Sequence, residues 1–160
     1  ALPSSNKWTR DMDIEGITVM HTGQPFTPVL SLDNSNSGNT GGSTAGLDRP
    51  NLIGNPDLSN PTANEWFNTA AFAIPAPYTF GNAGRNSLRG PGFASFDVAV
   101  SKRLPTNRRV GTTIQLQVFN LFNKTNFNLP GNDIDVPATF GRILSAQAAR
   151  QVQLSVRLGL

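Results

Sequence analysis

Residues 151–160 read QVQLSVRLGL and alternate strictly between apolar and polar positions. The apolar positions are Val152, Leu154, Val156, Leu158 and Leu160, and the positions between them are Gln151, Gln153, Ser155, Arg157 and Gly159. Successive side chains of a β-strand point to opposite faces of its sheet, so a period of two predicts a strand with one apolar and one polar face. We therefore expect a strand over residues 150–160.

Three earlier stretches show the same alternation and are expected to be strands as well. They cover residues 11–21, 93–104 and 109–122. The first is the least regular, because Ile17 and Val19 have the same parity as Asp13 and Glu15. The alternation predicts an all-β fold of antiparallel strands.

The connections between these strands differ greatly in length. Residues 105–108 read PTNR, a tight polar turn, whereas residues 22–92 and 123–149 are long loops rich in Gly, Pro, Ser and Asn. In an antiparallel sheet both long loops emerge at one end and the short turn at the other. Long strands with this arrangement are typical of an outer-membrane β-barrel, of which four strands would be a part. A soluble β-sandwich shows the same alternation and stays an alternative.

The composition narrows the class of protein further. Hydrophobic residues make up 38% and charged residues 14% of the 160, while the chain holds 15 Gly, 12 Pro and 17 Asn, which disfavour a helical bundle. The net charge of +3 comes from few charges, and the only close basic pairs are Lys102-Arg103 and Arg108-Arg109. Nucleic acid is therefore not an expected partner. The absence of cysteine excludes disulfides and thiolate metal sites.

Several motifs follow one another along the chain. The most extensive is GNAGRNSLRGPGF at residues 81–93, followed by Phe96-Asp97-Val98. The others are GQPFTP at 23–28, WFNTAAF at 66–72, FNLFNKTNF at 119–127, FGRI at 140–143 and RQVQL at 150–154. In this order they resemble the C-terminal barrel segment of TonB-dependent outer-membrane receptors. The nearest variety is the Oar-like group, whose members often carry a carboxypeptidase-regulatory-like domain.

The resemblance implies a role in taking up large nutrients, carbohydrate or siderophore-like, across the bacterial outer membrane. Residues 1–160 would be one C-terminal barrel piece, with outer-membrane lipid, the remaining barrel and the plug as partners. TonB would engage a preceding N-terminal part that these residues do not include. Four strands cannot close a barrel, so the isolated piece is expected to self-associate through open strand edges. The terminal Leu160 departs from the Phe usual in this group.

No catalytic constellation is recognisable in the sequence. His21 is the only histidine, and no Gly-x-Ser-x-Gly motif is present. We therefore do not expect an enzyme.

Aromatic residues of the first long loop are candidates for ligand binding. Trp66, Phe67, Phe72 and Tyr78 lie among Pro and Gly residues, where exposed rings would stack on sugars or apolar ligands. On this basis the alternative function is a soluble β-rich carbohydrate-binding module. The competing interpretation is that the rings anchor the loop to its own barrel or to a small core of its own.

A weak calcium motif precedes these aromatics. Asp33, Ser35 and Ser37 place side-chain oxygens at alternating positions before Gly38. The twelfth position of such a loop, however, is Thr44 instead of an acid. A surface loop without metal is the other interpretation, and no cofactor is otherwise expected.

Overall fold

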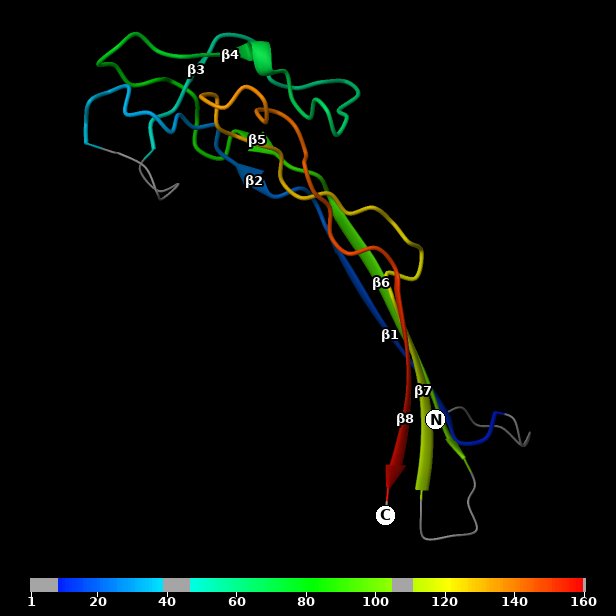
Figure 1. Ribbon diagram of the computed structural model, residues 1–160. Helices are drawn as coiled ribbons and strands as arrows, with labels where there is room; N and C mark the ends of the chain where they lie inside the picture. Colours follow the sequence, from blue (N-terminus) through cyan, green and yellow to red (C-terminus); the bar gives the residue numbers. More distant parts are fainter. Residues whose placement is uncertain (1–8, 39–46, 105–110, 160) are drawn as a thin grey trace. The chain divides into compact units, whose positions relative to one another are not determined.

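The computed structural model describes residues 9–38, 47–104 and 111–159, and it is built almost wholly from strands and irregular chain (Figure 1). The long strands are β1 (Met12–His21), β6 (Phe93–Leu104), β7 (Gly111–Phe119) and β8 (Gln151–Gly159). The short elements are β2 (Pro25–Phe26), β3 (Asn51–Leu52), the single 3-10 turn η1 (Thr69–Ala71), β4 (Phe72–Ala73) and β5 (Leu88–Arg89). The expected all-β antiparallel fold is confirmed. Among the described residues, no helix is long and apolar enough to cross a membrane.

The chain divides into two compact units. Unit 1 contains residues 1–21, 93–126 and 148–160, and unit 2 contains residues 22–92 and 127–147. The two long connections are therefore more than simple loops, because most of their residues together build unit 2.

Unit 1 is a four-stranded antiparallel sheet in the order β1-β6-β7-β8. Its register aligns apolar residues in rows across the strands. Val98 pairs with Val118, which pairs with Val152, and Val100, Leu116 and Leu154 form the next row. No ladder joins β1 to β8 within the described residues, so the sheet is open.

The third long strand, β7, ends at Phe119 and not at residue 122 as its sequence pattern predicted. The reason is Asn120, whose φ of 50° lies in the left-handed region that strands do not use. Its backbone N–H donates to Asp97 Oδ1 (2.8 Å), and its side chain bonds the backbone of Lys124 in both directions. Residues 109 and 110, the start expected for this strand, lie outside the described residues.

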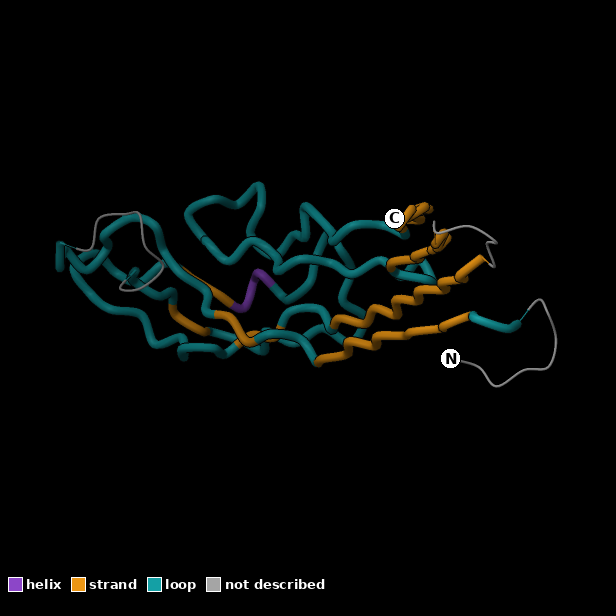
Figure 2. Tube along the Cα trace, turned by 90° about the horizontal axis from the view of Figure 1, so that it is seen from below, coloured by secondary structure: helices purple, strands orange, loops and turns teal. Residues whose placement is uncertain are grey.

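Unit 2 is irregular chain around a small aromatic core, and Figure 2 draws most of its path as loop. The buried hydrophobic residues of the core are Phe26, Phe67, Ala71, Phe72, Ala83, Leu88 and Phe140. The ring of Phe67 is perpendicular to the rings of both Phe72 and Phe140, at centroid distances of 5.7 and 5.1 Å. Edge-to-face pairs of this kind contribute about 0.5–1.5 kcal/mol each beyond area burial.

Backbone bridges tie the two segments of unit 2 together. Val29 forms a parallel bridge with Asp133, and Val29 N–H donates to Asn132 O at 2.8 Å. Elsewhere in the unit β2 pairs with β5, which brings Gly23 so close to Gly90 that a Cβ on Gly23 would overlap the Gly90 backbone. Glycine is therefore required at position 23.

Candidate functional site

One face of the unit 1 sheet is mainly apolar on all four strands, although Thr18, Lys102 and Thr112 also lie on it by the register. By the register, its rows contain Ile14 and Met20 of β1, Val98 and Val100 of β6, Ile114, Leu116 and Val118 of β7, and Val152, Leu154, Val156 and Leu158 of β8. The side chains on β1 and β8 are exposed, for example 68% for Leu154 and 69% for Leu158, whereas Val98 and Val100 of the inner strand β6 are half-buried. A continuous apolar surface of this kind is unusual in water and marks a face that contacts lipid or another apolar partner.

The opposite face of the same sheet is polar over most of its length. Cross-strand neighbours there include Gln115 with Ser155 and Gln117 with Gln153, and the acids Asp13 and Glu15 occupy the same face of β1. Such residues suit contact with water. The irregularity expected in the first strand is real, since Ile17 and Val19 lie on this polar face and are 63% and 46% exposed.

Aromatic side chains gather where the strands meet the long connections. Phe122 packs on Phe96 of the apolar face, with ring centroids 5.6 Å apart, and is 75% exposed. Phe119 belongs by its parity to the polar face, opposite Gln151, and His21 stacks on Phe93 at 5.1 Å. Phe122 thus stands where barrels carry an interfacial ring of aromatics.

At the end of the sheet where the long connections begin, asparagine side chains form hydrogen bonds with the backbone instead of strand-to-strand pairs. Asn126 is 3% exposed and bonds Ala94 twice, accepting from its N–H at 3.0 Å and donating to its carbonyl at 2.9 Å. Asn123 Oδ1 accepts the N–H of Arg150, the residue before β8. The motif at 119–127 is therefore a closing turn for unit 1.

Four other motifs of the sequence meet in unit 2. Residues 23–28 and 81–93 are joined by the β2–β5 pair, while Trp66 N–H donates to Gly141 O at 2.8 Å and Phe67 packs on Phe140. They are thus packing elements of one core. No regular spacing along the sequence indicates that these four segments contact one another.

The structure separates the four aromatic candidates. Phe67 and Phe72 are core residues, 3% and 6% exposed, and their rings pack on each other and on Phe140. Tyr78 is 76% exposed in an irregular segment at a φ of 65°. Trp66 is half-buried, and its Nε1–H donates to the carbonyl of Arg89 at 2.9 Å.

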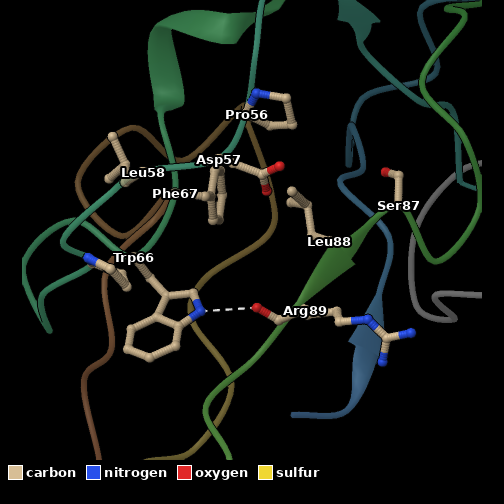
Figure 3. A pocket seen from close by; sticks show the side chains of 9 residues that line it. Pro56, Asp57, Leu58, Trp66, Phe67, Ser87, Leu88 and Arg89 are labelled. Atoms are coloured by element: carbon tan, nitrogen blue, oxygen red, sulfur yellow. Dashed lines mark hydrogen bonds between the residues drawn. The ribbon is translucent and has the colours of Figure 1, made fainter.

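Trp66 lines a half-open pocket of about 400 Å³ in unit 2 (Figure 3). Besides Trp66 and Phe67, the residues around it include Pro56, Asp57, Leu58 and Leu88, with Ser87 and Arg89 at its margin. The sequence did not indicate Asp57, Ser87 or Arg89 as site residues, because they belong to separate segments joined only through the core. Pockets of roughly this volume are within the range that binds small molecules.

The segment proposed as a calcium loop is held by its own carboxylate. Asp33 accepts the N–H groups of Ser37 (2.9 Å) and Gly38 (2.8 Å), while Ser35 bonds the buried Asp48 through both its N–H and its hydroxyl. Burial raises the pKa of Asp33, but the hydrogen bonds from Ser37 and Gly38 outweigh it, so this pKa lies below its ordinary value. No group of three or more His, Cys, Asp or Glu side chains among the described residues is arranged to hold a metal ion.

Comparison with curated proteins gives no match, and neither does comparison with solved structures. A family model described as outer membrane beta barrel domain matches residues 5–153, nearly the whole chain. This family is located in the bacterial outer membrane, where lipid surrounds the barrel wall, and the one-sided apolar sheet of unit 1 fits that setting. The chain belongs to the outer membrane beta barrel domain family.

Proposed function

We propose that this chain is the C-terminal part of a TonB-dependent receptor that takes up a large nutrient across the outer membrane. In this role β1, β6, β7 and β8 supply barrel wall, and unit 2 lies outside the cell and helps to capture the nutrient. The chain itself performs no catalysis. The rest of the barrel, a plug and TonB are the partners of the complete receptor.

This proposal rests on the four points at which the chain passes from one unit to the other. The chain passes between units after His21, before Phe93, after Asn126 and before Ala148, and all four points belong to the same end of the antiparallel sheet. At the opposite end of the sheet, residues 105–110 connect β6 to β7. Outer-membrane barrels place short turns on the periplasmic side and long loops outside the cell. A folded unit on those loops is suited to bind a nutrient before transport.

The apolar face separates this proposal from the soluble carbohydrate-binding module. A soluble module needs its apolar faces packed on each other, because exposing them to water costs about 25 cal/mol per Å². Val152, Leu154 and Leu158 are instead 64–69% exposed. Lipid covers such a face in a barrel wall, and the open edges of β1 and β8 then pair with further strands of the barrel.

Binding to TonB tests the receptor part of the proposal. The complete gene product, purified in detergent, is expected to bind the soluble periplasmic domain of TonB in a pull-down assay. A variant from which the segment before the plug is deleted is the matched control and is expected to lose that binding. A complete gene product that lacks a plug or does not bind TonB would remain a barrel protein and would contradict the receptor assignment.

A further inference from the structure

The pocket in unit 2 combines an apolar floor with a polar margin. The floor consists of the buried side chains of Phe67 and Leu88, and Trp66, Pro56 and Leu58 stand around it. Asp57, Ser87 and Arg89 are exposed at the margin. In Figure 3 the Asp57 carboxylate points toward the Leu88 side of the pocket, and the Arg89 guanidinium points away from Trp66.

The apolar part of the pocket is held in place before any ligand arrives. The indole of Trp66 is fixed by the bond from its Nε1–H to Arg89 O, and its backbone N–H donates to Gly141 O. Phe67 beneath it is fixed by three aromatic neighbours, Phe26, Phe72 and Phe140. A ligand therefore orders few side chains on binding, which improves affinity.

The polar margin offers both an acceptor and donors, with no net charge. Within the described residues, the Asp57 carboxylate, the Ser87 hydroxyl and the Arg89 guanidinium have no hydrogen-bond or ion-pair partner. One carboxylate and one guanidinium balance each other in charge. A neutral ligand rich in hydroxyl groups matches this margin, because each hydroxyl both donates and accepts.

We propose that this pocket binds one ring of a neutral oligosaccharide. The C–H face of the sugar lies against the Trp66 side of the apolar floor, and its hydroxyl groups donate to Asp57 and accept from Ser87. This deepens the proposed function by naming the class of nutrient, and it rests on that function only for the step from binding to uptake.

A peptide fits the same pocket less well. Proline-rich peptides dock in aromatic-lined grooves. Here the indole N–H of Trp66 already donates to Arg89 O at 2.9 Å, so it does not donate to a peptide carbonyl. The Asp57 carboxylate at the margin accepts hydrogen bonds, which sugar hydroxyls donate and proline, without a backbone N–H, does not.

Fluorescence of Trp66 tests this proposal. The chain contains two tryptophans, Trp8 and Trp66, so the variant Trp8→Phe leaves Trp66 as the only indole of the chain. The full chain in detergent micelles is titrated with maltohexaose, cellohexaose and xylohexaose up to about 10 mM, which saturates a site of millimolar Kd. A saturable change in emission is expected with at least one of these sugars.

The Asp57→Asn variant then locates the site. Loss of a charged acceptor is expected to weaken binding about tenfold or more. The matched control is Glu65→Gln, which removes the same charge from an exposed residue next to Trp66 but outside the pocket lining, and it is expected to leave the affinity unchanged.

Three outcomes would overturn the proposal. They are no change in emission with any of the sugars, equal affinity of the Asp57→Asn variant and its parent, and a response to a proline decapeptide in place of the sugars. None of them affects the TonB pull-down, so failure of the sugar site and failure of the receptor assignment are distinguishable.

Discussion

At the scale of single residues, Asp33 shows how a polar loop of unit 2 holds its shape. Its hydrogen bonds from Ser37 and Gly38 favour the ionised carboxylate, so the folded-state pKa lies below the ordinary value of 3.8. A lowered folded-state pKa stabilises the loop above the unfolded-state pKa, and this contribution is lost as the pH falls through the folded-state value.

We therefore predict that the amide proton resonances of Ser37 and Gly38 titrate together with a midpoint below pH 3.8. An NMR titration of the chain in detergent measures this, with Asp33→Asn as the variant in which the shared titration disappears. The Leu30 amide, which donates to the backbone carbonyl of Asp48, is the internal reference and should not share that midpoint. A shared midpoint above 3.8 would show that the two N–H groups do not favour the ionised carboxylate.

At the scale of elements, the division of each long strand into an apolar and a polar face was the feature most readily predicted from the sequence. The alternation over residues 151–160 identifies the two faces of β8, because a slip of one residue against β7 would turn every side chain to the opposite face. The end of β7 was not predictable in this way. Apolar residues continue to Phe122, and only the local side-chain bonds of Asn120 and its positive φ stop the strand.

Cysteine scanning of β8 follows from these faces. Residues 1–160 contain no cysteine, and any cysteine elsewhere in the complete protein is first replaced by serine, so that each introduced thiol is the only one. In outer membranes holding the complete protein, we predict that a water-soluble maleimide labels Gln153→Cys and Ser155→Cys but not Val152→Cys and Leu154→Cys. Unfolding in denaturant should make all four equally reactive, which controls for expression. Equal labelling of the four in the membrane would contradict a lipid-facing apolar side.

At the scale of the whole molecule, the core of unit 2 was largely hidden from the sequence. A small core for the aromatic residues was one interpretation of the pattern, but its members come from segments around residues 26, 67, 72 and 140. No periodicity links these segments, and only long-range bridges such as the one between Val29 and Asp133 bring them together. The pocket beside Trp66 depends on that assembly and was therefore not predictable either.

We predict that Phe67→Ala unfolds unit 2 and leaves the sheet of unit 1 intact. Truncation of a buried Phe costs about 3–5 kcal/mol, and Phe67 contacts three other rings of the core. Limited proteolysis in detergent should then cut within residues 22–92 and 127–147 and spare residues 93–104. The control Phe80→Ala removes a 71% exposed ring of the same unit and should not increase cleavage. Cleavage throughout both units would show that they do not unfold separately.

The discontinuity of unit 2 in the chain also limits when it can form. Phe67 lies in one connection and Phe140 in the other, with β6 and β7 between them in the sequence. The first segment therefore cannot complete its core until the second has been synthesised. Because the contacts of this core join residues far apart in the chain, we expect unit 2 to form more slowly than the hairpin of β6 and β7.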